Sequence, residues 1–206
     1  MHQTRQEATT RLPIERKGTK YIARASSDLE NSVPVIIALR DILKLAKTKK
    51  EVKKMIIQKM LKINGREVID QNESIKLFNL FEAGKTYVLK LSPTRKFFFE
   101  ETKDSKERLC KIIGKRLVSG NKIQLNLHDG TNLLWDKKAN VGDSVYLDLS
   151  GKIKKHISPE KGREVFIISG RYEGQHGKIV NIQDRKISVK FKENSSVLGL
   201  GNLILL

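Results

Sequence analysis

His128 and Asp129 are neighbours, and a histidine beside an aspartate is a pair that general acid–base catalysis can use. They are followed at once by Gly130 and Thr131, and HDGT has the composition of a tight turn between two strands. The one cysteine, Cys110, lies in an alternating apolar stretch and is expected in a hydrophobic core. We therefore interpret all of these residues as structural and predict no catalytic residue.

Metal and cofactor chemistry has equally little support in the sequence. The histidines show no ligand spacing such as HxxxH, and one cysteine cannot build a cysteine-rich zinc site. No GxxxxGK[ST] phosphate loop is present. Acidic pairs such as Glu100-Glu101 fall in a polar connector, where we expect them to be solvated. We predict no metal, no cofactor and no enzyme. The histidines are His2, His128, His156 and His176.

The charge of the chain points to another chemistry, the binding of polyanions. The 206 residues include 41 Lys and Arg against 23 Asp and Glu, a net charge of +18. Nucleic acid is the obvious intracellular polyanion, and its affinity should fall steeply with salt. An anionic membrane is the rival, but no run of eighteen apolar residues, secretory signal or strongly amphipathic helix favours it. We expect an intracellular protein without membrane association.

Two helices are predicted early in the chain, at 33–46 and 49–60. Pro34 suits the first turn of the first helix. Thr48 is a candidate N-cap of the second, with Glu51 as its capping-box partner. The apolar positions expected to point inward are Ile36, Leu39, Leu43 and Ala46 on the first helix and Val52, Met55 and Ile56 on the second.

The rest of the chain is predicted to be mainly β-structure. LKINGREVI forms a hairpin around Asn64-Gly65, and 85–92 alternates like a strand. Beyond Pro93, strands alternate with turns at Gly120-Asn121, Asp129-Gly130 and Ser150-Gly151. The predicted fold class is α+β with mostly β content. The predicted domains are a basic, weakly structured N-terminal extension (1–32), a small α/β module (33–92), a central β domain (93–163) and a second small β module (164–206).

Like charges gather on the predicted helix pair. Residues 33–66 hold ten Lys and Arg against Asp41 and Glu51 alone. A merely solvated helix would interleave Glu and Lys at i,i+4, because that pairing stabilises it. Here the repulsion costs stability unless a phosphate backbone neutralises it. Contact with nucleic acid is therefore favoured over a solvated face.

The stretch LRDILKLAKTKKEVKKMIIQKMLKINGREVID resembles the S-four RNA-binding domain, in which two helices and an adjoining strand present a basic surface to structured RNA. The resemblance implies RNA rather than DNA. Together with the basic arm, it nominates Arg11, Arg16, Lys17, Lys20, Arg24, Arg40, Lys44, Lys47, Lys49, Lys50, Lys53, Lys54 and Arg66 as RNA-binding.

A second resemblance lies near the C-terminus. VFIISGRYEGQHGKIVNI has glycines at 170, 174 and 177 between apolar alternating strands, and it resembles the KOW motif of small SH3-like barrels. An ordinary β-turn is the simpler interpretation. The resemblance implies loop contacts with RNA or protein, and the nominated residues are Arg171, Tyr172, His176 and Lys178.

The order of these segments resembles the S-four-e family of archaeal and eukaryotic small ribosomal subunit proteins, from about Leu12 to Ile182. The linker QNESIKLFNLFEAGKTY departs from the family pattern. The resemblance implies a structural component of the cytoplasmic ribosome. Its implied partners are small-subunit ribosomal RNA and neighbouring ribosomal proteins, with no homo-oligomer.

Other functions are compatible with such a chain. A translation or transcription factor could bind the ribosome or polymerase transiently, and a heat-shock-type factor could use the same small domain. RNA-modifying enzymes such as pseudouridine synthases carry it too, but they need a large catalytic domain with an aspartate motif, and none is visible after residue 93.

Overall fold

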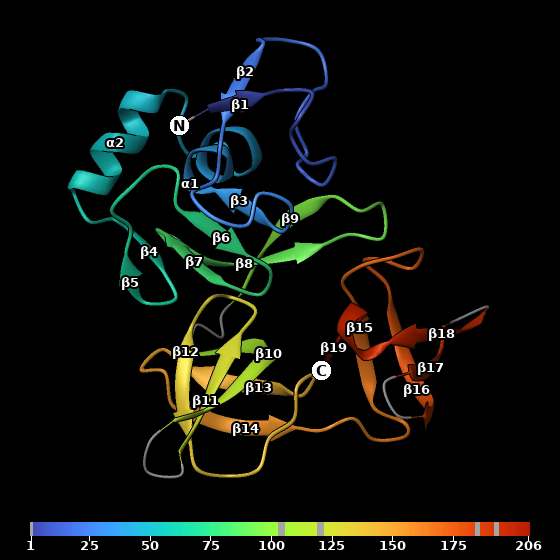
Figure 1. Cartoon of the computed structure of the whole chain (residues 1–206). Helices are drawn as coiled ribbons and strands as arrows, with labels where there is room; N and C mark the ends of the chain where they lie inside the picture. Colours follow the sequence, from blue (N-terminus) through green and yellow to red (C-terminus); the bar gives the residue numbers. More distant parts are fainter. Residues whose placement is uncertain (1, 103–105, 119–121, 184–185, 192–193) are drawn as a thin grey trace. The chain divides into compact units, whose positions relative to one another are not determined.

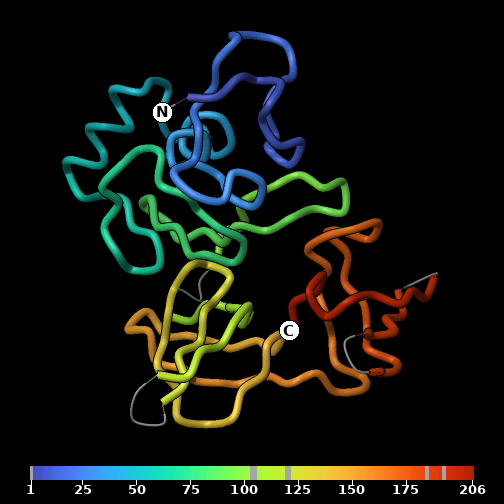
Figure 2. The backbone as a smooth tube through the Cα atoms, in the orientation of Figure 1, coloured from blue at the N-terminus to red at the C-terminus, as the bar shows by residue number. Residues whose placement is uncertain are grey.

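The structure is a computed structural model that describes residues 2–102, 106–118, 122–183, 186–191 and 194–206. It divides into two compact units, Met1–Ser105 and Lys106–Leu206. The tube in Figure 2 shows that the chain completes the first unit before it enters the second. Short helices and several antiparallel sheets make up the two units (Figure 1), which confirms the predicted α+β class with mostly β content.

The first unit contains all the α-helix described in the chain and three antiparallel sheets. Two of the sheets have two strands, β1-β2 and β3-β6, and the third has the order β5-β4-β7-β8-β9. Its elements are β1 (His2–Thr4), β2 (Tyr21–Ala23), β3 (Ser32–Pro34), α1 (Val35–Ile37), the π-helix η1 (Ala38–Ile42), α2 (Lys49–Ile57), β4 (Leu61–Ile63), β5 (Arg66–Glu67), β6 (Ser74–Lys76), β7 (Leu80–Ala83), β8 (Lys85–Leu91) and β9 (Phe97–Glu101).

The N-terminal segment is packed rather than weakly structured, which corrects the sequence-based expectation. β1 and β2 form an antiparallel pair, and the Arg5 guanidinium holds the loop between them closed. Arg5 donates to the Thr19 carbonyl at 2.8 Å and to the Glu15 carbonyl. Leu12 is only 2% exposed, so the segment has apolar residues of its own to bury. That burial offsets the entropy of ordering the chain.

The first helix is shorter than the sequence predicts. Val33 and Pro34 lie in β3 and pair with β6. The helix starts at Val35 and widens into a π-helical turn, where the Leu43 N–H donates to the Ala38 carbonyl five residues back at 2.8 Å. The prediction over 33–46 is therefore correct for 35–42. It is wrong at 33–34, because these residues pair in β3, and at 43–46, which lie beyond the end of the helix.

The hairpin predicted around Asn64-Gly65 is confirmed. Asn64 and Gly65 have φ of 53° and 81°, the two positive values that a type I′ turn requires. Across the turn, Ile63 pairs with Arg66. The strand predicted at 85–92 is also confirmed as β8. Phe81 on β7 is fully buried in the core beneath this sheet.

The second unit holds two five-stranded antiparallel sheets with the orders β12-β11-β10-β13-β14 and β18-β17-β16-β15-β19. Each sheet has its own apolar cluster, one around Cys110 and Leu125 and the other around Val165 and Val189. Its elements are β10 (Glu107–Val118), β11 (Lys122–Leu127), β12 (Asn132–Trp135), β13 (Ser144–Asp148), β14 (Ile153–Ile157), β15 (Glu164–Ile167), β16 (His176–Gln183), β17 (Lys186–Lys190), β18 (Ser195–Gly199), the 3₁₀-helix η2 (Leu200–Asn202) and β19 (Leu203–Leu205).

Turns in this unit follow the sequence prediction where they are described. Gly130 and Gly151 both have positive φ, at 90° and 81°, and their N–H groups close the turns on the Leu127 and Asp148 carbonyls at 2.9 Å. The turn predicted at Gly120-Asn121 lies outside the described residues.

Gly177 is required for a different reason, close packing. A Cβ there would lie 2.4 Å from Val189 Cγ1 on the neighbouring strand.

Within the described residues, no helix is long and apolar enough to cross a membrane.

Candidate nucleic-acid interface

Helix α2 presents a cationic surface to solvent. Its four lysines are exposed, and none of them forms an ion pair within the described part of the chain. Lys49 and Lys53, like Lys50 and Lys54, are four positions apart, so each pair is adjacent on the helix surface. Each like-charged i,i+4 pair costs about 0.2–0.5 kcal/mol of helix stability. In the free protein, therefore, the positive charges of these lysines repel one another without a described acidic partner. The four residues are Lys49, Lys50, Lys53 and Lys54.

The one acid of α2 is used by the cap and not by the lysines. The Glu51 N–H donates to the Thr48 hydroxyl at 3.3 Å, and the Glu51 carboxylate accepts from the Lys47 N–H at 2.7 Å and from the Thr48 hydroxyl at 3.1 Å. The backbone bond from Lys47 is the largest cause that lowers the pKa of Glu51. The predicted cap and capping-box partner are confirmed.

The apolar side of α2 fixes which way the lysines point. Val52 is fully buried, and Met55 and Ile56 are half-buried, as the sequence predicts. Because residues 52, 55 and 56 share one stripe of the helix, Lys50 and Lys54 lie on the opposite arc, and Lys49 and Lys53 lie beside the stripe. The hydrophobic pattern thus positions the cationic surface.

The first helix contributes one paired and one unpaired cation. Arg40 donates to Asp41 through Nε at 2.9 Å and through a terminal nitrogen at 2.8 Å. This hydrogen-bonded carboxylate raises the pKa of Arg40 and neutralises part of its charge. Lys44 follows in the left-handed region with φ of 55°, is exposed, and has no ion-pair partner in the described ranges. Lys47, before α2, is exposed as well.

A cleft of about 480 Å³ brings the N-terminal segment and the first helix together. Lys17 lines it from the loop between β1 and β2, while Arg40 and Lys44 line it from the first helix. The structure therefore joins nominated residues from two segments that sequence reasoning treated separately.

The other nominated residues of the first unit are more dispersed. Arg11 donates to Asn31, Arg16 donates to the Ala8 carbonyl at 3.4 Å, and Arg24 is exposed. The Lys20 ammonium lies 5.3 Å from the centre of the Tyr21 ring. Arg66 is held by Glu73 at 2.9 Å. Among the described residues of the first unit, cations without an ion-pair partner gather on α2 and at the cleft.

The nominated residues of the second unit lie on β16 and in the turn before it. The Tyr172 ring stacks on Phe191 at 4.5 Å and carries Arg171 at 5.8 Å from its centre. His176 packs edge-on against Phe166 at 5.1 Å. Tyr172 is thus part of the core packing.

His176 and Lys178 line a cleft of about 490 Å³ together with Lys190. Lys190 was not nominated from the sequence. Its signal was present, since Ile187 and Val189 alternate inward on β17 and so place Lys190 outward. Lys178 lies 3.8 Å from Glu164, which lines the same cleft and offsets part of its charge.

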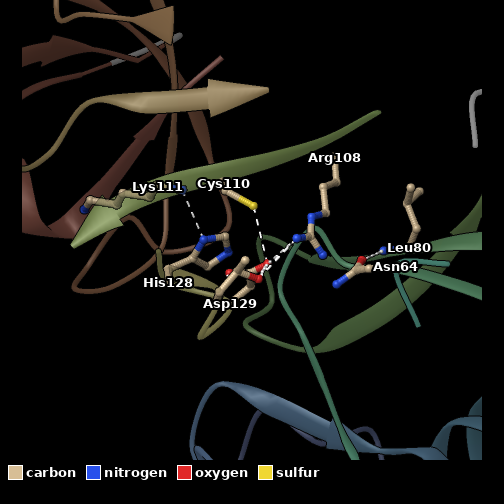
Figure 3. Close-up of polar contacts among 8 residues, drawn as sticks. Asn64, Leu80, Arg108, Cys110, Lys111, His128 and Asp129 are labelled. Carbon is tan, nitrogen blue, oxygen red and sulfur yellow. Dashed lines mark hydrogen bonds and ion pairs between the residues drawn. The ribbon is translucent and has the colours of Figure 1, made fainter. Parts of the chain in front are cut away.

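His128 and Asp129 do not form a catalytic pair (Figure 3). His128 Nδ1 accepts from the Lys111 N–H at 3.1 Å. The Asp129 carboxylate instead lies 3.3 Å from the Arg108 guanidinium and accepts from the Thr131 N–H at 2.9 Å. The prediction of a hairpin turn is confirmed.

Cys110 is equally unsuited to nucleophilic chemistry. It is 1% exposed in the core of the β12-β11-β10-β13-β14 sheet, called the central sheet below, as predicted, and burial raises the pKa of its thiol. Among the described residues, no group of three or more His, Cys, Asp and Glu could hold a metal ion.

The fold and these surfaces define a class: a basic, mostly β protein with a helix pair, a C-terminal five-stranded sheet and exposed cationic surfaces. Comparison with known proteins gives the family. The model of ribosomal family S4e matches residues 83–153, and the KOW motif matches 161–190. The chain belongs to the S4e family of ribosomal proteins.

Relatives cover most of the chain. It is 30% identical to small ribosomal subunit protein eS4 of Methanocella arvoryzae over 88% of this chain and 81% of the relative. The eS4 protein of Natronomonas pharaonis is 33% identical over the same shares of the two chains. The crystal structure of 30S ribosomal protein S4e from Thermoplasma acidophilum has the same fold, with a TM-score of 0.73 at 23% identity, covering 86% of this chain and 95% of that one.

Proposed function

We infer that this chain is a non-enzymatic, structural component of the small ribosomal subunit in the cytoplasm, and that it binds ribosomal RNA. Its relatives are named as small-subunit proteins. The observation that carries the RNA-binding role is the row of exposed lysines on α2 that lack an acidic partner among the described residues. In the free protein that row costs stability, and packed phosphates would remove the cost.

The proposed mechanism is neutralisation of phosphates together with recognition of folded RNA by shape. Base-specific contacts are few in this account. The strongest contributions come from the lysines of α2 and from the cleft beside the first helix. The full set of proposed RNA contacts is Arg11, Arg16, Lys17, Lys20, Arg24, Arg40, Lys44, Lys47, Lys49, Lys50, Lys53, Lys54, Arg66, Arg171, Tyr172, His176 and Lys178.

Neighbouring proteins of the subunit are the second class of partner. Ile57 and Ile69 line one groove and are 80% and 77% exposed. The groove is also lined by one cation and one anion, Lys53 and Asp70. Exposed isoleucines with balanced charges suit an apolar protein segment better than a phosphate backbone.

Quantitative co-sedimentation of native lysate tests the proposal. The gradient should carry one copy per small subunit, retained after a high-salt wash. Each copy is held by many phosphate and protein contacts at once, so partial screening should not release it. Substoichiometric or salt-labile association would overturn the structural role and favour the alternative, an RNA-binding translation or transcription factor that associates transiently.

A further inference from the structure

The cleft between the β1–β2 loop and the first helix has the size and lining of a small-ligand site. Its volume of about 480 Å³ lies within the range of about 300–1,000 Å³ typical of ligand pockets. The loop wall is held in place by Arg5, which donates to the Thr19 carbonyl at 2.8 Å and to the Thr19 hydroxyl at 3.0 Å. The opposite wall is the π-helical turn η1, an irregularity that often occurs at functional sites.

The charges of the cleft suit one phosphate group. Four cations line it against the carboxylates of Glu15 and Asp41. Two of the cations, Lys17 and Lys44, are exposed and form no ion pair within the described ranges. The other two are Arg5 and Arg40, and both are already hydrogen-bonded to protein acceptors. Lys17 and Lys44 are therefore the groups available to an anion.

The remaining lining suits a flat, partly apolar group that carries hydrogen-bond donors. Pro13 and Ile14 offer apolar surface from the loop. Each carboxylate oxygen of Asp41 accepts one hydrogen bond from Arg40, at 2.9 and 2.8 Å. A carboxylate has about four lone-pair positions, so each oxygen can accept a further hydrogen bond. The side chain of Asp41 is 29% exposed, which leaves those positions reachable.

We propose that this cleft receives a single unstacked nucleotide of the bound RNA, with its phosphate between Lys17 and Lys44 and the amino group of its base donating to Asp41. The inference rests on the proposed RNA-binding function and adds base selection to it. Sequence-specific recognition of RNA uses bases that are splayed out of loops and bulges. Carboxylates accept from the exocyclic amine of cytosine, whereas uracil presents a carbonyl oxygen at that position and is repelled.

The test is titration of the full chain with CMP, UMP and inorganic phosphate, followed by NMR shifts of backbone amides near Asp41 and Lys44. CMP should bind at least about fivefold more tightly than UMP, and phosphate alone should be weakest. The double variant Lys17→Gln/Lys44→Gln should weaken CMP about tenfold or more. Lys85→Gln is the matched control, because Lys85 is exposed on the same unit, does not line the cleft and is not among the proposed RNA contacts.

Asp41→Asn tests base selection separately. An amide both donates and accepts, so the variant should bind CMP and UMP with equal affinity. No shift with CMP, equal binding of CMP and UMP by the wild type, or phosphate binding as tightly as CMP would each overturn the proposal. If the nucleotide titrations fail but the chain still co-sediments stoichiometrically with the small subunit after the high-salt wash, the proposed ribosomal function stands. Loss of subunit association with normal CMP binding would instead overturn that function alone.

Discussion

The helix pair of the first unit and the central sheet of the second unit use cationic side chains in opposite ways. On α2, the lysines are exposed and lack carboxylate partners within the described residues. In the central sheet, Arg108 is 8% exposed and lies 3.3 Å from Asp129, whose side chain is 1% exposed. A buried charge must be satisfied within the fold, whereas an exposed one can be satisfied by a partner.

Lys111 is a second buried cation whose hydrogen bonds are satisfied within the fold. It is 3% exposed, and its ammonium donates to the carbonyls of Leu200 and Gly201 at 2.9 and 2.6 Å. It thereby ties the central sheet to the C-terminal segment of the same unit. The difference teaches that net charge alone does not identify a binding surface: the useful cations are those that the fold leaves without acceptors.

Removing Asp129 should have the largest effect on stability. Asp129→Ala leaves the Arg108 guanidinium buried without its carboxylate, and breaking a buried pair in this way typically costs about 3–5 kcal/mol. Urea unfolding followed by fluorescence of Trp135, the one tryptophan of the chain, reports on this unit. A loss below about 1 kcal/mol would show that the pair is not a buried constraint.

Lys111 should make stability depend on pH. Burial lowers its pKa to about 8 from 10.5. Between those values the folded state has released the proton and the unfolded state still holds it, so stability should rise with pH. The rise is at most about 3 kcal/mol. Lys111→Met should abolish it.

Cys110 acts with the opposite sign in the same range. Burial raises the pKa of its thiol above the ordinary value of 9.0, so its contribution to stability falls as pH rises past about 9. The Lys111 comparison is therefore made in a Cys110→Ala background. An equal rise with and without Lys111 would contradict the assignment.

Loss of the α2 cap should have an intermediate effect. Thr48→Ala removes the hydroxyl that accepts from the Glu51 N–H at 3.3 Å, and such losses cost about 1 kcal/mol. Amide hydrogen exchange of Val52 and Ile56 should become faster, while the urea-unfolding transition followed by Trp135 fluorescence should stay unchanged. If exchange is unaltered, the cap does not hold the cationic surface in place.

Reversing one lysine should stabilise the helix slightly. Lys50→Glu places an acid in the first turn and creates a Glu–Lys pair with Lys54 at i,i+4, together worth about 0.5–1 kcal/mol. Slower exchange at Val52 combined with weaker RNA binding would show that the wild-type residue serves binding at the expense of stability. Faster exchange would mean that the like charges are not a cost.

Local signals predicted much of the fold. Asn64-Gly65 fixes its hairpin because both residues tolerate positive φ, and Thr48 with Glu51 fixes the start of α2. The nominated lysines of α2 follow from charge and period within one segment. Such features depend on residues close in the chain, so the sequence carries them directly.

Long-range features escaped prediction. The strand pairing of Val33 with Ile75 shortened the first helix, and no local signal marks it. The meeting of Lys17 with Lys44 in one cleft depends on how the β1–β2 loop packs. Lys111 is buried because a carbonyl pair some ninety residues later accepts its hydrogen bonds. Each needs tertiary packing, which charge and periodicity do not encode.

The central claim is tested most directly by changing Lys50, Lys53 and Lys54 together to Glu and measuring affinity for small-subunit ribosomal RNA against salt concentration. The account predicts loss of binding at ~0.15 M salt and a salt slope smaller by about 2–3 units, with the fold intact. The matched control reverses three exposed lysines of the second unit, Lys106, Lys152 and Lys161, and should retain most of the affinity. Unchanged affinity of the α2 variant, or an equal loss in the control, would contradict the account.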